Sequence, residues 1–397
     1  MSKYSKEDIL RMVDEEDVGF IRLQFTDVFG TVKNIAVTAG QLEQALNNEC
    51  SFDGSGIDGF VRIEEDDMYL YPDLDSFEIF PWRPQTGKVA RLICDIHKCD
   101  GTPFEGDSRY ILKQVIREAA KMGIYPYIAP ECEFCLFPYD TDGEVMLQTQ
   151  GHGSYFDVAP LDTGENVRRD IILALEDMGI DVRSSYHEHS PYQHEIDLQP
   201  VNALAAADNI VTFRMTCKTI ASRHGLHATF MPKPMNDSDG CGMHLKMTLM
   251  DLEGNNILSD PADSYGLSEL GYHFMAGIMA HVRGLTAVTN PLVNSYKRIV
   301  PGNEAPAYIV WSSGNRSPLI SVPRTSAKDM HIELRNPDPC VNSYLAFAGI
   351  IAAGLEGIKK GLAEGVEKGL AEGMEKGMNK RSLEIARKML ANGMDAA

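Results

Sequence analysis

The chain has 397 residues, enough for two or three domains, and 44% of them are hydrophobic. It carries 57 Asp and Glu against 37 Lys and Arg, which gives a formal net charge of −20. This balance argues against nucleic acid as a partner, because phosphate recognition needs basic patches, and it suits a soluble, cytoplasmic protein.

The N-terminal part, over 1–103, predicts a small α+β unit. Alternating apolar residues indicate two strands that pair across a turn at 29–30, and a polar, glycine-rich loop follows at 51–59. The opening residues are polar and charged, so we expect no signal peptide. The expected elements are a helix over 4–15 and strands over 19–25, 32–37 and 88–94.

Helices and strands alternate after a predicted domain junction at 100–106. The alternation favours an α+β or α/β domain in which helices back a sheet. The longest apolar run, 344–355, is too short to cross a bilayer, so we expect no membrane partner. The predicted helices cover 109–122, 164–178, 203–224 and 268–288.

Four short segments place ionisable side chains on alternate residues. Alternate residues of a strand share one face, and the residues between them are apolar or nearly so. The pattern predicts a sheet with one apolar face and one face dense in carboxylates, His and Arg. One such motif alone is more often a solvated strand face, but four together favour a site for divalent cations and a charged substrate. The segments are 131–133, 195–197, 244–246 and 331–335.

Carboxylates dominate the candidate ligands. Carboxylate oxygens and neutral imidazole suit Mg²⁺ or Mn²⁺, and five converging carboxylates would repel one another without two or more cations. Arg298, Arg316 and Arg335 could clamp carboxylate or phosphate oxygens, which together with metals is the pattern of phosphoryl transfer. The sequence has no P-loop or kinase motif set. The candidate ligands are Glu131, Glu133, Glu188, Glu195, His244 and Glu333.

Cysteine usage points to reduced thiols. Eight cysteines are scattered along the chain, and only Cys132 and Cys135 form a C-x-x-C pair. A structural zinc site would need a second ligand pair, and in a strand these two side chains point to opposite faces. We therefore expect reduced cysteines, as is usual in the cytoplasm.

The C-terminal segment, 357–397, has a different character. Glycine recurs at every fourth residue from Gly357 to Gly377, an apolar residue follows each glycine, and Glu and Lys fill much of the rest. Each glycine costs roughly 1 kcal/mol relative to alanine within a helix. The segment is therefore either a solvated tail or a helical element that packs against another subunit.

Taken together, the sequence motifs resemble those of one family, the type I glutamine synthetases in their shorter bacterial form. The matching runs occur in family order and cover the chain from residue 1 to about 358. They are FDGS at 52–55, PECEF at 130–134, HE at 187–188, QHEID at 193–197, FMPKP at 230–234, GMH at 242–244, NSYKRIVPG at 294–302, EAP at 304–306, NRSP at 315–318, ELR at 333–335 and PD at 337–338.

The resemblance implies a fold and a reaction. The fold would be α+β, with a small β-grasp N-terminal domain over 1–103 and a larger catalytic domain over 104–356, in which helices back an antiparallel sheet. The reaction would join glutamate and ammonia to glutamine with ATP, through γ-glutamyl phosphate and two or three Mg²⁺ or Mn²⁺ per site. The partners would be further copies of the chain, in a hexameric ring or dodecamer with active sites between subunits.

Where a motif of this chain matches the family, the resemblance implies the role of each matching residue. Glu133, Glu188 and Glu195 resemble ligands of a first metal, and Glu131, His244 and Glu333 resemble ligands of a second. Asp53, from a neighbouring subunit, resembles the group that takes a proton from ammonium, and Glu304 the flap residue that shields the acyl phosphate from water. Gly240 and Arg298 match glutamate-binding positions, while Arg316 and Arg335 match positions near the transferred phosphate and the substrate carboxylate.

Several positions depart from the family pattern. Asp239 and Lys246 stand where the family usually has Asn and His or Asn, and Ser321 and His331 each replace an Arg. These changes leave two alternatives to glutamate–ammonia ligation. The chain could join glutamate to a different amine, or it could be a catalytically weak paralogue that binds nucleotide and metal in an assembly or regulatory role.

Overall fold

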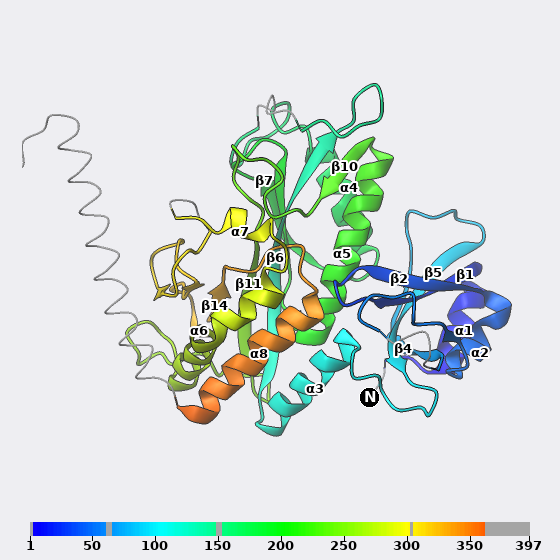
Figure 1. The fold of residues 1–397 in the computed structure, drawn as a ribbon, viewed down its shortest axis with the longest axis horizontal. Helices are drawn as coiled ribbons and strands as arrows, with labels where there is room; N and C mark the ends of the chain where they lie inside the picture. The colour runs from blue at the N-terminus through cyan, green and yellow to red at the C-terminus, as the bar shows by residue number, and fades with distance from the viewer. Residues whose placement is uncertain (1–2, 61–65, 148–152, 302–304, 362–397) are drawn as a thin grey trace, which may run out of the picture.

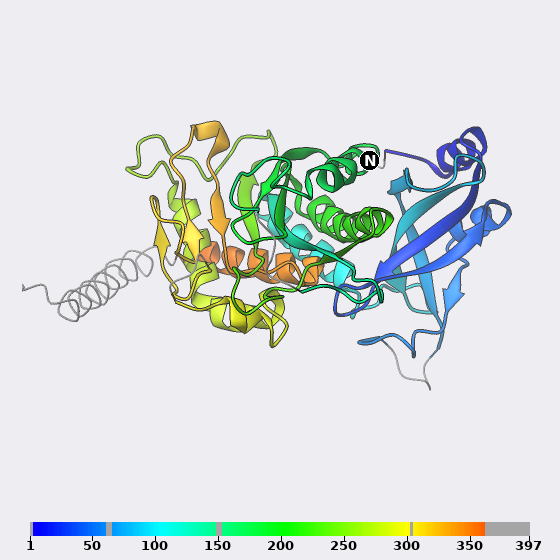
Figure 2. The ribbon, with the colours of Figure 1, turned by 90° about the horizontal axis from the view of Figure 1, so that it is seen from above.

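The computed structural model describes residues 3–60, 66–147, 153–301 and 305–361, and these form two parts side by side along the long axis (Figures 1 and 2). Each part has its own sheet and its own buried core. Both parts mix helices with largely antiparallel sheets, so the predicted α+β class is confirmed.

The N-terminal part is a five-stranded sheet of order β2-β1-β5-β4-β3 with short helices packed on it. The predicted helix and three strands are all present, and β1 pairs antiparallel with β2 and parallel with β5. Strand β4 has no counterpart among the expected elements. The elements are α1 (Lys6–Glu15), β1 (Val18–Thr26), β2 (Val32–Thr38), η1 (Ala39–Gln41), α2 (Leu42–Leu46), β3 (Ser51–Phe52), β4 (Met68–Ile79) and β5 (Lys88–His97).

The larger part is a nine-stranded sheet of order β12-β13-β14-β11-β6-β8-β7, with β9 and β10 also paired to β6. All its pairings are antiparallel except that of β12 with β13. The strands are β6 (Tyr125–Pro138), β7 (Val182–His187), β8 (Gln193–Leu198), β9 (Val201–Asn202), β10 (Leu226–Thr229), β11 (Met243–Met250), β12 (Trp311–Ser312), β13 (Ile320–Ser321) and β14 (Ile332–Leu334).

The four predicted helices of this part are present within a few residues of their expected ends. Side-chain caps help to explain where several begin: the Asp107 carboxylate accepts from Arg109 N (3.0 Å), and the Ser268 hydroxyl accepts from Gly271 N (3.2 Å). The helices are α3 (Ser108–Lys121), α4 (Glu165–Glu176), α5 (Ala203–Arg223), α6 (Glu269–Thr289), α7 (Ser295–Arg298), η2 (Ala327–Asp329) and α8 (Ser343–Lys360).

The alternation in the charged strands sorts their residues between two faces. Phe134, Ile196 and Leu245 are buried in the main core with residues of α5, α6 and α8. Their charged neighbours in sequence therefore point to the opposite face of the sheet. Cys132 belongs to the main core and Cys135 to a separate cluster, as expected for residues three apart on a strand, and all eight cysteines are free.

A buried arginine ties the two parts together. Arg109, at the start of α3, donates to Asp95 on β5 (2.7 Å), to Asp73 on β4 (2.7 Å) and to both oxygens of Asp208 on α5 (2.9 and 3.0 Å). Tyr344 on α8 also donates to Asp208 (2.6 Å). Because these charges are paired and hydrogen-bonded, the network positions the small sheet against the helices of the large part.

Helix α8 carries the long apolar run and ends at Lys360, with Gly361 as a left-handed C-cap. It passes through residue 357, where the predicted tail was expected to begin. The glycine repeat beyond residue 361 lies outside the described residues. Within the described ranges, none of the helices has the length and apolar character needed to cross a bilayer.

Candidate active site

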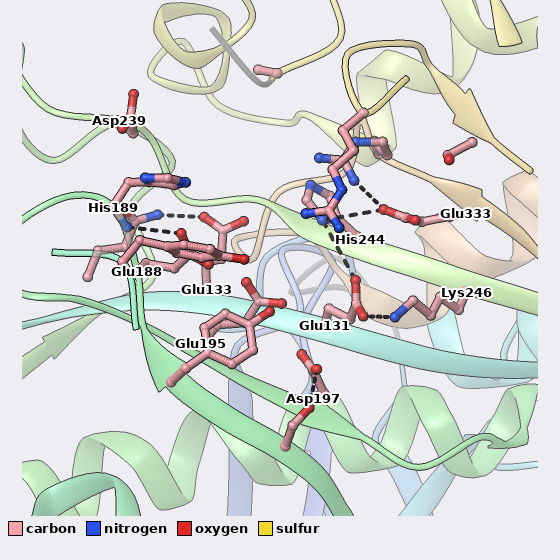
Figure 3. Close-up of a pocket in the computed structure, with 18 of the residues that line it drawn as sticks. Glu131, Glu133, Glu188, His189, Glu195, Asp197, Asp239, His244, Lys246 and Glu333 are labelled. Atoms are coloured by element: carbon pink, nitrogen blue, oxygen red, sulfur yellow. Dashed lines mark hydrogen bonds and ion pairs between the residues drawn. The ribbon is translucent and has the colours of Figure 1, made fainter. Parts of the chain in front are cut away.

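A pocket of about 500 Å³ lies on the charged face of the large sheet (Figure 3). Strands β6, β7, β8, β11 and β14 supply its floor, and loops around Tyr155, Asp239 and Arg316 supply its walls. The predicted site residues that line it are Glu131, Glu133, Glu188, Glu195, Gly240, His244, Arg298, Arg316, Glu333 and Arg335.

Strand register brings the acidic residues together. On β6 and β8, Glu131 pairs with Asp197 and Glu133 pairs with Glu195. On the other side of β6, Glu131 pairs with His244 of β11. Directly paired residues share a face and lie within side-chain contact, so this register gathers residues far apart in the sequence.

Within the pocket lining, two groups of ligand atoms are compact enough to hold a cation, with atoms within 4.8 Å of one another. One contains Glu131, His244 and Glu333, which is the trio expected for a second metal. The other joins Glu131 and Glu195 to Asp197. Asp197 accepts from Ser184 Oγ (2.5 Å) through one oxygen, and its buried Oδ1 has no hydrogen-bond partner in the described part of the chain.

The trio expected for a first metal is less compact. Glu133 and Glu188 interact through their charges, as do Glu133 and Glu195, and all three are buried. The amide of Gln193 donates to Glu133 (2.6 Å) and to the carbonyl of Gly240 (3.2 Å). Gln193 therefore links one predicted metal ligand to one predicted glutamate-binding residue.

The buried carboxyls have perturbed pKa values. Burial, followed by the nearby charge of Asp197, raises the pKa of Glu131 to about 7. Burial and then the charge of Glu188 raise the pKa of Glu133, while burial and then Glu133 raise that of Glu195. Burial together with repulsion between neighbouring carboxylates outweighs the nearby Lys and Arg charges, so the donor set fits divalent cations.

His244 is held as a neutral ligand. Burial, followed by the field of Arg335, lowers its pKa well below the usual range. Its Nδ1 lies 3.8 Å from an oxygen of Glu131 and 3.8 Å from an oxygen of Glu333, and a neutral ring forms no ion pair with either. A neutral imidazole between two carboxylates is a common metal-binding arrangement.

The three arginines predicted to contact substrate line the pocket. Arg298 is buried and donates to the carbonyls of Asn336 (3.1 Å) and Arg335 (3.2 Å), while Arg335 contacts Glu333. Arg316 is exposed, and its positive charge acts on the phenol of Tyr155 in the pocket wall. The structure therefore keeps two guanidinium groups in fixed positions and one at the surface.

Glycine is required beside Arg298. A Cβ on Gly242 would lie 2.4 Å from Arg298 Nη2, and a Cβ on Gly240 would lie 2.5 Å from the carbonyl oxygen of Pro232. Both clashes are closer than side-chain atoms normally approach. The absence of side chains at 240 and 242 therefore lets the backbone run against the arginine and the acidic cluster.

One described residue of the predicted site does not line this pocket. Asp53 is exposed after β3, where its carboxylate accepts from Ser55 N (2.8 Å), and it is not among the described residues that line the pocket of its own chain. Glu304 lies outside the described residues.

Some pocket residues were not predicted as ligands or substrate contacts. Asp197 completes the second compact group, and the alternation in 195–197 was the signal for it. Tyr155 and His189 stack in the wall with ring centroids 4.3 Å apart, and Arg183 lines the pocket from β7. Nothing in their spacing distinguishes these three from ordinary loop and surface residues.

A third group, Asp162 with His187 and His194, lies outside the pocket lining. Arg168 occupies it: its Nη1 lies 2.7 Å from Asp162 and 2.9 Å from Nδ1 of His194. His187 donates through Nδ1 to the carbonyl of Glu188 (2.7 Å). We interpret the group as a support for Glu188, because a guanidinium already supplies its positive charge.

Four of the departures from the family pattern line the pocket: Asp239, Lys246, Ser321 and His331. Lys246 contacts Glu131 directly. Ser321 pairs with Glu333 across β13 and β14, and His331 donates through Nδ1 to the carbonyl of Asp329 (2.7 Å). These four substitutions therefore lie at the site itself.

Family models match both parts of the chain. Residues 17–99 match the glutamine synthetase beta-Grasp domain, and residues 105–388 match the glutamine synthetase catalytic domain. The chain is 56% identical over 362 residues to glutamine synthetase from Clostridium saccharobutylicum, covering 91% of this chain and 82% of that one. It is 55% identical over 360 residues to glutamine synthetase from a Staphylococcus aureus strain, with 90% and 80% covered.

Solved structures show the same fold. A structure described as a GmaS/ADP complex superposes with a TM-score of 0.82 at 31% identity, covering 89% of this chain and 82% of that one. Glutamine synthetase from Plasmodium falciparum superposes with a TM-score of 0.83 at 27% identity, covering 91% and 76%. The β-grasp and catalytic architecture expected from the sequence is thereby confirmed.

Proposed function

Because the chain belongs to the glutamine synthetase family, we propose that its acidic pocket is the place where glutamate and ammonia are joined. The activity is ATP-dependent ligation of glutamate and ammonia to glutamine, and the family uses ATP and a divalent metal. The single observation that supports the pocket as the site is the convergence of six predicted metal ligands on it.

The residues present fit divalent cations, since buried carboxylates with raised pKa values surround a neutral imidazole. We assign one cation to Glu133, Glu188 and Glu195, with Asp197 adjoining, and another to Glu131, His244 and Glu333. Mg²⁺ or Mn²⁺ suits these oxygen-rich sets, and two or three ions per site are expected. When bound, the cations would neutralise phosphate oxygens of ATP and of the transferred group.

The protein groups then orient glutamate. The fixed guanidiniums of Arg298 and Arg335 face the anionic substrate, and the backbone at Gly240 approaches closely enough to contact it. Arg316, exposed in the wall, can follow the phosphate as γ-glutamyl phosphate forms, which turns a poor carboxylate electrophile into one with a leaving group. Orientation by fixed donors lowers the barrier because they need no rearrangement during the reaction.

Ammonia must lose a proton before it attacks. Asp53 is the proposed base, and we place it at the pocket of a neighbouring subunit, because its exposed carboxylate lies away from the pocket of its own chain. This arrangement needs an oligomer with sites between subunits, and a hexameric ring or a dodecamer meets that need. The flap role of Glu304, the domain limits 1–103, 104–356 and 357–397, and the cytoplasmic location stay predictions.

One assay tests the function. Purified full-length protein with ATP, Mg²⁺ and glutamate should release phosphate when ammonia is added, and glutamine should appear in equal amount. A parallel panel of primary amines tests the acceptor, because the carboxylate of Asp239 lines the pocket and could bind a cationic acceptor. Phosphate release with an amine but none with ammonia would contradict ammonia as the acceptor.

A further inference from the structure

Lys246 brings a positive charge into a group of proposed metal ligands. It lies two residues after His244 on β11, so both side chains point to the pocket face of the sheet. Its ammonium contacts Oε1 of Glu131 (Figure 3). The Lys246 side chain is 20% exposed, so its amine can also reach solvent in the pocket.

Strand register explains the contact. Lys246 pairs with Glu333 of β14 on one side and with Ala129 of β6 on the other, and Glu131 is two residues further along β6. This is the diagonal position, which a long lysine side chain can span. The strand register therefore positions the Lys246 side chain beside the group formed by Glu131, His244 and Glu333.

The carboxylate of Glu131 can pair either with the ammonium of Lys246 or with a divalent metal ion. Its Oε1 contacts the ammonium, while its Oε2 lies 3.8 Å from Nδ1 of His244. A divalent ion held by Glu131 and His244 would be close to the ammonium, and the two positive charges repel each other. The lysine also satisfies part of the negative charge that would otherwise attract the ion.

The other proposed cation site has a different environment. The partner of Glu133 is the neutral amide of Gln193 (2.6 Å), and its charged neighbours include Arg298 rather than Lys246. Lys246 thus acts on the group of Glu131, His244 and Glu333 in particular.

From this geometry we propose that Lys246 is a built-in counter-ion that competes with the divalent cation of Glu131, His244 and Glu333. This cation then binds more weakly than it would at the same three ligands without the lysine. An anionic nucleotide entering the pocket attracts the ammonium away from Glu131, so nucleotide and this cation strengthen each other's binding. The inference rests on the proposed assignment of the metal ligands.

The test counts bound cations without any turnover. Mn²⁺ is titrated into metal-free full-length protein, and free Mn²⁺ is followed by electron paramagnetic resonance. Two affinity classes are expected for the unchanged protein, and ADP should tighten the weaker one. Lys246→Gln should tighten the weaker class by about tenfold without ADP, because a unit charge is removed at contact distance. It should also abolish most of the effect of ADP.

Matched variants separate charge from shape. Lys246→Arg keeps the charge and should keep the weak class, while Lys88→Gln removes a lysine that pairs with Glu16 in the N-terminal part and should change nothing. Unchanged or weaker Mn²⁺ binding in Lys246→Gln would overturn the role of the lysine while leaving the metal assignment intact. Unchanged protein that binds no Mn²⁺ would overturn both. If Lys246→Gln fails to fold, the absence of any ADP effect on the unchanged protein would still overturn the inference.

Discussion

At the scale of single residues, the site depends on carboxylates that are both buried and close together. Glu131, Glu133 and Glu195 are at most 9% exposed, and the pKa of each is raised by burial and by a neighbouring carboxylate. Such a cluster is unfavourable in the absence of cations, because ionised groups lose hydration and repel. This is the physical reason why it indicates a metal site rather than a structural surface.

Glu195→Gln should remove a cation-binding oxygen while keeping the shape of the side chain. We expect glutamine formation to fall by about 10²–10³-fold, since the loss of one preorganised group has effects of that order. Mn²⁺ affinity should fall with it, in a titration of the metal-free protein. Glu253→Gln, at an exposed turn, is the control and should leave both measurements unchanged.

The raised pKa of Glu131 predicts how stability depends on pH. In the unfolded chain this carboxyl ionises near pH 4.5, whereas burial holds its pKa at about 7 in the folded state. Between these values the folded state binds more protons, so the free energy of unfolding of metal-free protein should decrease as pH rises. Thermal denaturation in EDTA measures this, and Glu131→Gln should show a smaller decrease over the same range.

Mg²⁺ should reverse that trend. Ligands bind a cation in their ionised form, so added Mg²⁺ should raise the melting temperature more at about pH 7 than at about pH 5. A Mg²⁺ effect that is equal at both values would contradict a site built from carboxyls with raised pKa values.

At the scale of elements, helices α6 and α8 cross at glycines. A Cβ on Gly357 would lie 2.2 Å from the carbonyl oxygen of His273 and 2.5 Å from the nitrogen of Gly277. The residue that begins the glycine repeat is thus a packing position in a helix and not part of a solvated segment. Propensity alone suggests that glycine weakens this helix, but close backbone contact favours it here.

Gly357→Ala should therefore destabilise the protein, by about 1–3 kcal/mol, which is typical for overpacking a close contact. Gly284→Ala provides the control within α6, because a Cβ there meets nothing within 4 Å. That change should be neutral or should stabilise by up to about 1 kcal/mol. Urea denaturation of both variants gives the comparison, and equal effects would refute the packing role of Gly357.

At the scale of the whole molecule, specific hydrogen bonds and ion pairs hold the two parts together. Arg109 connects acidic residues of both parts, and Asn342 at the start of α8 donates to the carbonyls of Asp27 (3.3 Å) and Val28 (3.1 Å). Gly30 lets this loop approach Asn342, because a Cβ at residue 30 would lie 2.7 Å from Cα of Asn342. The φ of Gly30, +76°, also favours glycine at this position.

Shared active sites can be tested by mixing two inactive variants. Asp53→Asn alters the proposed base, and Glu195→Gln alters the metal site of the other subunit. If the two residues act across an interface, random co-assembly from equal co-expression should restore about a quarter of the activity, because both intact halves meet in one site in four. Activity no greater than the sum of the two separate variants would place both residues in one chain.

Much of this molecule follows from local sequence patterns. Strands β1, β2 and β5 and helices α3, α4, α5 and α6 were predicted because their periodicity and turn residues agree with their final environment. Strand β4 was not predicted, since Pro72 interrupts its alternation and its register against β5 shifts between Asp73 and Glu78. The expected strand at 331–335 is reduced to Ile332–Leu334.

The sequence by itself determined which side chains share a face: a period of two puts Glu131 and Glu133, or His244 and Lys246, on one side of a strand whatever the strand pairs with. Only the tertiary structure decided which of these strands became neighbours. The pairing of Glu131 with Asp197 and His244 depends on the register between distant segments, and burial in the assembled sheet raises the pKa of Glu131. The contact of Lys246 with Glu131 arises in the same way, because side-chain spacing is a local property whereas desolvation and charge pairing depend on the assembled sheet.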